Sequence, residues 1–293
     1  MFNFVANKKW FFMFSIAIVV IAAISFFIQG FNFDIDFTGG TQIRAEINKE
    51  FDNDTISGLV EDIIGEKPSI QKSTNPITGE NTDVVIKTRE LSAAERTEIY
   101  SILHSYYSID IENGVSSDNI SSAVGSDLKS SAIWASLIAV LLMMIYIAFR
   151  FEFTTAIATI IALLHDILIL IAVYTLFQIP VNLTFIAAVL TVLGYSTNDT
   201  IVLFDRIREN LKGMKKVTIA EVVNASIWQT MRRTIFTTST TLLVIVLLYI
   251  LGVPSIREFA LPLMIGIGFG IYSTIFIAAQ LWVLFVGGEN RKA

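Results

Sequence analysis

The stretch of sequence that decides the fold is VNLTFIAAVLTVLGYSTNDTIVLF, residues 181–204. Its 24 residues are long enough to cross a bilayer as one helix, and Asp199 is the single charged residue among them. Placing an ionisable group inside a membrane costs at least a few kcal/mol, so such a residue is retained for a purpose. The stretch therefore predicts a transmembrane helix with a functional acid in its second half.

The composition of the whole chain agrees with a membrane protein. Of its 293 residues, 54% are hydrophobic and only 16% are charged, and its mean hydropathy is +0.65. These values exclude an ordinary soluble enzyme. The net charge of −5, with Lys and Arg scattered over short loops, gives no reason to expect nucleic acid as a partner. The absence of cysteine excludes disulfides, Cys-ligated metals and a Cys nucleophile.

Six apolar runs predict an α-helical polytopic membrane protein with six transmembrane helices. They cover residues 10–28, 132–149, 153–177, 181–204, 235–251 and 259–286. The first run follows Lys8 and Lys9, as in a signal peptide. It is longer than the 7–15 residues of a signal h-region, however, and its end offers no small-residue cleavage site, so we expect it to be retained.

The basic residues next to these runs predict the orientation. With the N-terminus inside, twelve of the 21 Lys and Arg flank the cytoplasmic ends, and the short outer loops contribute Arg257 alone. Both termini are then cytoplasmic. We expect a first segment at 1–29, an extracytoplasmic domain at 30–131, transmembrane helices 2 to 6 at 132–286 with a cytoplasmic loop at about 205–234, and a cytoplasmic tail at 287–293.

The segment 30–131, between the first and second transmembrane helices, is long enough to fold alone. Its pattern predicts strands at 41–47, 69–72 and 83–88, helices at 54–64 and 92–107, and a short last strand at 108–112. This order, β-α-β-β-α-β, is that of a ferredoxin-like α+β domain. Residues 75–79 predict a turn and 116–131 a polar lead into the second span, while Gly39 and Gly40 predict a tight turn at the domain's entry.

Polar residues occur at membrane depth in three places. His165 and Asp166 lie in the middle of the third run, and Asn198 and Asp199 lie in the fourth. Arg233 precedes the fifth run and leads a stripe of threonines at helical spacing, Thr237, Thr240 and Thr241. These residues are the candidates for an ion pathway, because a buried carboxylate must be protonated, paired or hydrated.

Each candidate also has a structural explanation. His165 could equally be a core histidine bonded to a neighbouring helix, and Arg233 could be a positive-inside anchor that snorkels to the interface. For Asp166 and Asp199 a functional or pairing role is favoured. On antiparallel helices Asp199 and Arg233 lie at similar depths, so we expect them to pair.

Other features predict packing. Gly266 and Gly270, with Ser273 or Thr274, form a small-residue stripe that allows close helix packing, and we assign Gly194 the same role. Residues 217–232 predict an amphipathic helix in the cytoplasmic interface.

Several ordered stretches resemble the SecF proteins of the SecD/SecF protein-export family, within the resistance-nodulation-division superfamily. They are residues 35–41, IDFTGGT; 165–166, HD; 194–200, GYSTNDT, running on to 204–210, FDRIREN; 233–234, RT; and 270–276, GIYSTIF. Together they cover essentially the whole chain. Two positions depart from the family pattern: Asp34 stands in place of a usual Gly, and Thr197 in place of an aliphatic residue.

The resemblance implies an accessory subunit of the Sec translocase. It would work with SecD and use the proton or sodium gradient to help a secreted polypeptide finish crossing through the SecYEG channel, in contact with the insertase YidC and with membrane lipid. It implies no cofactor, no metal and no enzymatic activity. In the family the intramembrane acid falls on Asp199 and its basic partner on Arg233, and both are thought to serve the ion pathway; Asp166 and His165 are second-rank contributors.

Two rival functions remain open at this point. A solute exporter of the same superfamily usually carries twelve spans in one chain, so a chain with six spans would need a partner. A membrane-embedded enzyme needs a nucleophile or a metal site, and the sequence has no HExxH, GxSxG or paired intramembrane Asp motif. Whether protons or sodium ions are used is not decided by a buried carboxylate alone.

Overall fold

The computed structural model describes residues 2–73, 83–214 and 216–288. The chain divides into two compact units. The helical unit comprises Met1–Asn32, Ala135–Leu251 and Glu258–Ala293, and the smaller unit comprises Phe33–Trp134 and Gly252–Arg257.

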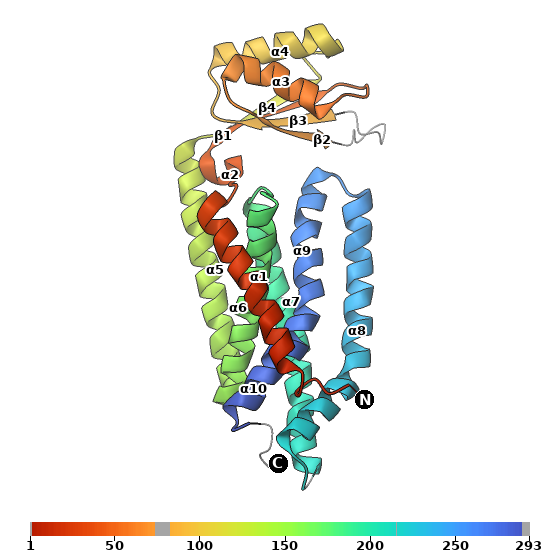
Figure 1. Cartoon of the computed structure of the whole chain (residues 1–293). Coiled ribbons are helices and arrows are strands. Elements are labelled where there is room, and N and C mark those ends of the chain that lie inside the picture. Colours follow the sequence, from red (N-terminus) through yellow and green to blue (C-terminus); the bar gives the residue numbers. More distant parts are fainter. Residues whose placement is uncertain (1, 74–82, 215, 289–293) are drawn as a thin grey trace. The chain divides into compact units, whose positions relative to one another are not determined.

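Six helices in the described residues are long and apolar enough to cross a membrane, as the apolar runs predicted. The first five are α1 Lys8–Gln29, α5 Ser122–Arg150, α6 Phe153–Leu176, α7 Leu183–Gly213 and α8 Ile219–Leu251. The sixth span, Ser255–Phe285, combines α9 Pro254–Tyr272, the π-helix η1 Ser273–Ala278 and α10 Ala279–Phe285. In the helical unit, the start of α1, the end of α10 and the connection between α7 and α8 lie at the same end (Figure 1).

The helix predicted at 217–232 is present from Ile219 on, but it does not end at residue 232. It forms the first part of α8, which continues to Leu251. No Gly or Pro occurs in α8 to break it. The apolar side of this part is also not free for lipid, because Val222, Val223 and Ile227 are fully buried in a core cluster that includes Phe204.

In the smaller unit, the strands β1 Gly40–Glu46, β2 Ser69–Ser73, β3 Asp83–Thr88 and β4 Val115–Ile120 form an antiparallel sheet of order β2-β3-β1-β4. The helices α3 Asn53–Ile64 and α4 Ala93–Tyr107 cover one face of this sheet (Figure 1). This is the ferredoxin-like arrangement. The alternation that predicted the strands follows burial: Ile43 on β1 faces Ile86 on β3, and both are fully buried with Ile56 of α3 and Ile99 of α4.

The last strand lies later than predicted. Residues 108–112 are not a strand: Ser108 adopts a left-handed conformation, with φ of 57°, that ends α4, and Asp110 accepts hydrogen bonds from the next turn, at Glu112 N and Asn113 N. β4 instead begins at Val115, overlaps the expected polar lead and pairs Ser117 with Ile43. It is a polar edge strand, so its sequence lacks the apolar alternation that marks the other strands. The turn predicted at 75–79 lies outside the described residues.

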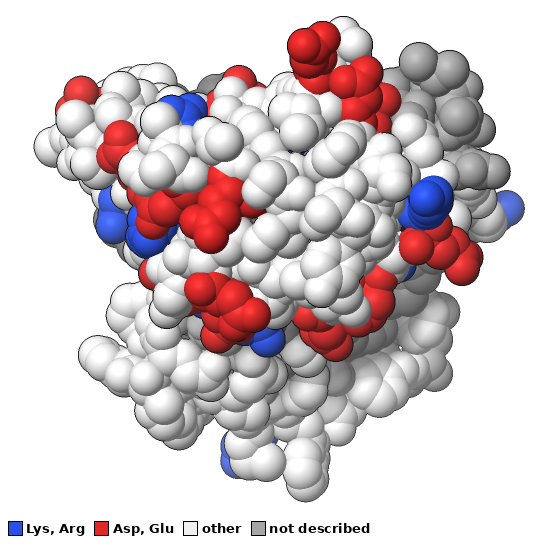
Figure 2. All heavy atoms as spheres, turned by 90° about the horizontal axis from the view of Figure 1, so that it is seen from above, with Lys and Arg blue, Asp and Glu red and all other residues white. Residues whose placement is uncertain are grey.

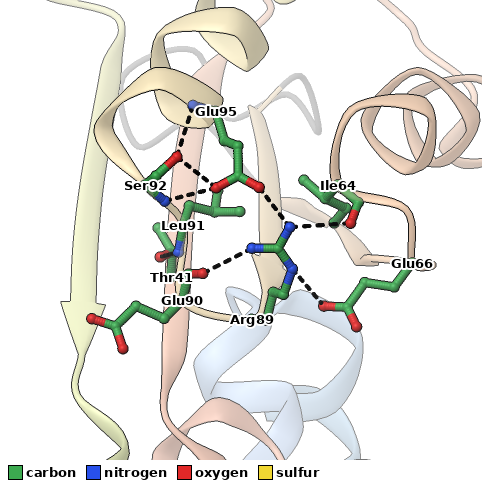
Figure 3. Close-up of polar contacts among 8 residues, drawn as sticks. All are labelled: Thr41, Ile64, Glu66, Arg89, Glu90, Leu91, Ser92 and Glu95. Atoms are coloured by element: carbon green, nitrogen blue, oxygen red, sulfur yellow. Dashed lines mark hydrogen bonds and ion pairs between the residues drawn. The ribbon is translucent and has the colours of Figure 1, made fainter.

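A cluster of hydrogen bonds and ion pairs around Arg89 joins the end of α3 to the start of α4 (Figure 3). Arg89 Nη2 donates to Ile64 O at 3.1 Å and to Glu95 Oε1 at 2.5 Å, and Nε lies 3.6 Å from Glu66 Oε1. Glu95 also completes a capping box with Ser92. The hydrogen bonds from Arg89 and Ser92 lower the pKa of Glu95 to about 2.

The predicted turn at Gly39 and Gly40 has a clear steric cause. Both residues have positive φ, 75° and 155°. A Cβ on Gly39 would lie 2.6 Å from Ser122 Cα, and one on Gly40 would lie 2.3 Å from Thr88 O. The backbone therefore approaches so closely that only glycine fits at this corner.

Candidate functional site

The first polar cluster of the helical unit is built around Asp166 of α6, whose side chain is fully buried. Ser196 Oγ, from α7, donates to Asp166 Oδ2 at 2.6 Å, and Ser273 Oγ, from η1, donates to the same oxygen at 2.9 Å. Both serines are buried too. Two other helical segments, α7 and η1, thus each donate a hydrogen bond to one carboxyl oxygen of α6.

His165 lies beside this cluster. Its Nδ1 is 3.7 Å from Asp166 Oδ1, and neither ring nitrogen nor Asp166 Oδ1 has a hydrogen-bond partner among the described residues. The ring stacks on Tyr272, with centroids 5.8 Å apart and an interplanar angle of 24°. Tyr272 in turn donates to Phe11 O and bonds to Ser15 Oγ, both on α1. The histidine is therefore held by its ring faces and not by its nitrogens.

The second polar cluster surrounds Asp199, also on α7 and also buried. Thr238 Oγ1 of α8 donates to Asp199 Oδ2 at 3.3 Å, and Arg233 interacts electrostatically with the carboxylate. Both Asp199 and Arg233 lie in the described part of the chain, and no ion pair within 4.0 Å joins them. The direct pairing expected from their depths is therefore not formed in this conformation.

Several polar side chains near Asp199 are exposed at the surface of the chain. Asn198 is exposed next to the buried Asp199, and Arg233 is exposed at the start of the threonine stripe. Within that stripe Thr237 and Thr240 are exposed, whereas the Thr241 hydroxyl bonds to the Tyr195 hydroxyl at 2.8 Å. A polar face on α7 and α8 at membrane depth is costly in contact with lipid, so it calls for a cover of protein or water.

A cavity of about 320 Å³ begins next to Arg233. Its lining comes from α7 and α8 and is strongly charged. The lining residues are Val202, Asp205, Arg206, Glu209, Gln229, Thr230 and Arg233. Val202 follows Asp199 by three residues, about 4.5 Å along the helix at 1.5 Å per residue. Water in this cavity would come within about one helical turn of the buried acid.

The glycines predicted to allow packing differ in their surroundings. A Cβ on Gly266 would lie 2.5 Å from a methyl of Val192, and one on Gly270 would lie 3.5 Å from Ser196 Cβ, so both permit the close approach of α9 to α7. A Cβ on Gly194 would meet no described heavy atom within 4 Å, and the packing role expected for Gly194 is therefore not seen within this chain.

The two departures from the family pattern have local explanations. Asp34 caps the short helix α2, Ile35–Thr38, by accepting from Ile35 N, and it pairs with Lys87 Nζ at 2.6 Å. Thr197 donates to Leu193 O at 2.7 Å and lies 3.2 Å from Met143 Sδ. Its hydroxyl therefore turns towards α5 and does not join the Asp199 cluster.

Sequence reasoning did not single out Ser196, Ser273 and Thr238 as ligands of the two acids. Ser196 and Ser273 stand inside the quoted stretches GYSTNDT and GIYSTIF, but nothing local distinguishes a serine that reaches a carboxylate from one that packs. Within the described residues no group of three or more His, Asp or Glu is arranged to hold a metal ion.

Comparison with known proteins identifies the family. The model of the family described as protein export membrane protein SecD/SecF, C-terminal, matches residues 100–287, and the model described as SecD/SecF GG motif matches residues 24–50. The protein translocase subunit SecF of Alicyclobacillus acidocaldarius is 39% identical over 297 residues, covering 100% of this chain and 95% of the relative. The chain belongs to the SecF family of protein translocase subunits. The SecF of Escherichia coli O157:H7 is 33% identical over 288 residues, an alignment that covers 96% of this chain and 86% of that protein.

Longer SecDF proteins contain a region similar to this SecF-family chain. The crystal structure of SecDF from Thermus thermophilus, described as a translocon-associated membrane protein, superposes with a TM-score of 0.85 at 34% identity. The superposition covers 97% of this chain and 38% of that one. The chain therefore spans about two fifths of the SecDF proteins it matches.

Proposed function

We propose that the chain works with a SecD-like partner and uses the proton or sodium gradient to promote late translocation and release of a secreted polypeptide. The observation that carries this proposal is the arrangement of Asp199 and Arg233, a buried acid and an exposed base that interact across α7 and α8 without direct contact. An acid that can be protonated or move into contact with Arg is a two-state element. One charge that moves through 100 mV releases about 2.3 kcal/mol, which can bias helix packing.

The open polar face on α7 and α8 supports a partner within the membrane. Asn198, Arg233 and Thr237 would be costly against lipid, and a SecD-like chain would cover them. The SecDF relatives carry additional sequence in the same polypeptide, since this chain covers only 39% of the SecDF protein of Thermus thermophilus. Contact with the SecYEG channel, with YidC and with membrane lipid follows from the family resemblance.

The positions of the basic residues support an extracytoplasmic location for the ferredoxin-like domain and cytoplasmic termini. Residues 30–131 carry 18 acidic and 8 basic residues, a net charge of −10. Figure 2 shows acidic side chains gathered over the face seen from above, with fewer basic ones among them. Our proposal is that this domain contacts the emerging polypeptide and discourages its return.

The proposal is tested with Asp199→Asn and Arg233→Met in cells that lack the native copy. The rate at which a secreted precursor matures is followed, and copurification with SecD reports assembly. We expect normal assembly and slow maturation for both variants. Arg232→Met is the matched control, because Arg232 is the neighbouring exposed arginine and lies over the Phe236 ring at 5.6 Å. Normal maturation in both test variants would contradict ion coupling through this pair.

A further inference from the structure

We propose that Asp166 and His165 share one exchangeable proton at the centre of the helical unit, in a site whose geometry suits a proton and not a sodium ion. The use of this proton in energy coupling rests on the function proposed above. The presence of a proton on the pair does not rest on that function, and it can be measured separately.

The two oxygens of Asp166 have different surroundings. Oδ2 accepts hydrogen bonds from Ser196 and Ser273, whereas Oδ1 is buried and has no hydrogen-bond partner among the described residues. A buried, ionised carboxylate with one bare oxygen is strongly unfavourable. A proton on Oδ1 removes the charge and leaves Oδ2 as the carbonyl oxygen that accepts both serine hydroxyls.

His165 provides the second location for this proton. Its Nδ1 lies 3.7 Å from Asp166 Oδ1, a separation that a small side-chain rotation brings to hydrogen-bond distance. In the transfer the Oδ1–H bond breaks and an Nδ1–H bond forms, giving a carboxylate and an imidazolium. The pair is neutral before and after the transfer, so the proton can move within it without leaving a net charge in the membrane. Loss of the proton to another acceptor leaves one negative charge.

The serines argue against a sodium ion. Each hydroxyl can donate its single hydrogen to Oδ2, and the Ser273 hydroxyl also lies 3.0 Å from Gly270 O. Ligands of a hard cation instead turn oxygen lone pairs towards it. The polar atom placed beside the unpartnered Oδ1 is a histidine nitrogen, Nδ1 of His165 at 3.7 Å. A hard cation that prefers several oxygen ligands is therefore poorly served at this position.

Few other titratable groups face the pair. α1 and α5 carry no charged residue at 10–29 and 132–149, and η1 and α10 carry none. On α7, Asp199 is directed to Thr238 of α8, and Tyr195 bonds to Thr241. Tyr272, at the end of α9, stacks on the His165 ring while its hydroxyl donates to Phe11 O. His165 is thus the titratable partner of Asp166 in this site.

The π-helix η1 sets one side of the site. Ser273 is its first residue, and the Ser273 hydroxyl lies 2.9 Å from Asp166 Oδ2 and 3.0 Å from Gly270 O. π-bulges often occur at functional sites.

Infrared difference spectroscopy of the purified full chain in lipid vesicles tests the proposal. We expect a carbonyl stretch of a protonated carboxylic acid that moves on deuterium exchange. It should be lost in Asp166→Asn, an isosteric change that can still accept from both serines, and retained in Asp199→Asn. Ser196→Ala should move the band to higher frequency, because one hydrogen bond to the carbonyl oxygen is lost, and this variant keeps the test valid if Asp166→Asn does not fold.

The result that overturns the proposal is equally specific. A wild-type band that Asp166→Asn leaves undiminished, or the absence of any such band from the folded wild-type chain at every pH, means that Asp166 does not hold a proton. Replacing KCl with NaCl at constant pH and ionic strength should leave the band unchanged, and its loss in sodium alone would assign the site to that ion. Precursor maturation in Asp199→Asn is a separate readout, so failure of the proposed function is distinguished from failure of this inference.

Discussion

Ser196 Oγ on α7 donates a hydrogen bond of 2.6 Å to Asp166 Oδ2 on α6, and both side chains are buried within this chain. The contact joins two of the stretches that mark the family, HD at 165–166 and GYSTNDT at 194–200. The two intramembrane acids thus have different partners, since Asp199, three residues after Ser196, is bonded to Thr238 of α8.

The approach of α9 to α7 at Gly266 predicts a steric effect. In Gly266→Ala the new Cβ lies 2.5 Å from a methyl of Val192, so we expect a loss of stability of about 1–3 kcal/mol, the usual cost of overpacking. Thermal unfolding of the purified chain measures it. Gly268→Ala is the control. Gly268 lies two residues further along the same helix, and a Cβ there would meet no described atom within 4 Å, so this change should leave the stability unchanged or raise it. Val192→Ala should rescue Gly266→Ala; no rescue would contradict the assigned clash.

The corner at Gly40 predicts a larger effect. In Gly40→Ala the Cβ meets the Thr88 backbone carbonyl at 2.3 Å, and that atom belongs to a strand and cannot turn away. Gly65→Ala is the matched control, because Gly65 also has positive φ but lies in open space. The control should cost only the left-handed conformation, about 1–2 kcal/mol, and Gly40→Ala should cost more. Equal losses on thermal unfolding would show that the contact with Thr88 is not limiting.

The pair of Asp34 and Lys87 predicts a coupled effect on stability. Their side chains are only 5% and 11% exposed. Removing one member of a buried ion pair removes this charge partner from the other, so Asp34→Gly should cost about 3 kcal/mol. A double-mutant cycle with Lys87→Met, followed by chemical denaturation, should show that the second change costs less in the Asp34→Gly background. Additive losses would mean that the two side chains do not depend on each other.

The cluster of hydrogen bonds and ion pairs around Arg89 predicts that the stability of the smaller unit depends on pH. The pKa of Glu95 is about 2 in the folded chain against an ordinary 4.5, so its stabilisation is complete above about pH 4.5 and is lost as the pH falls towards 2. Hydrogen exchange of the β1 amides, followed by mass spectrometry across this range, should show protection that falls in the wild type. The fall should be smaller in Glu95→Gln. Glu98→Gln, on the same helix, is the control, and an identical effect of both variants would refute the assignment.

The sequence by itself determined the number and type of the main elements. Run length predicted six spans, and alternation at Ile43 and Ile86 predicted two central strands, because both signals are local and follow from burial of one face. Capping chemistry at Ser92 and the glycines at 39 and 40 were equally readable, since a cap or a positive φ depends on few neighbours. The acids of the candidate site were also found, because a charge inside an apolar run stands out.

Tertiary structure decided what depends on distant residues. The polar strand β4 exists through its pairing with β1, and the first part of α8 is buried by residues such as Phe204, so neither could be read from its own sequence. The same holds for the ligands of Asp166: Ser196 and Ser273 lie 30 and 107 residues away along the chain. A serine in an apolar helix is common and does not by itself mark a site. Only the packing of α6, α7 and η1 makes these two serines the partners of a buried acid.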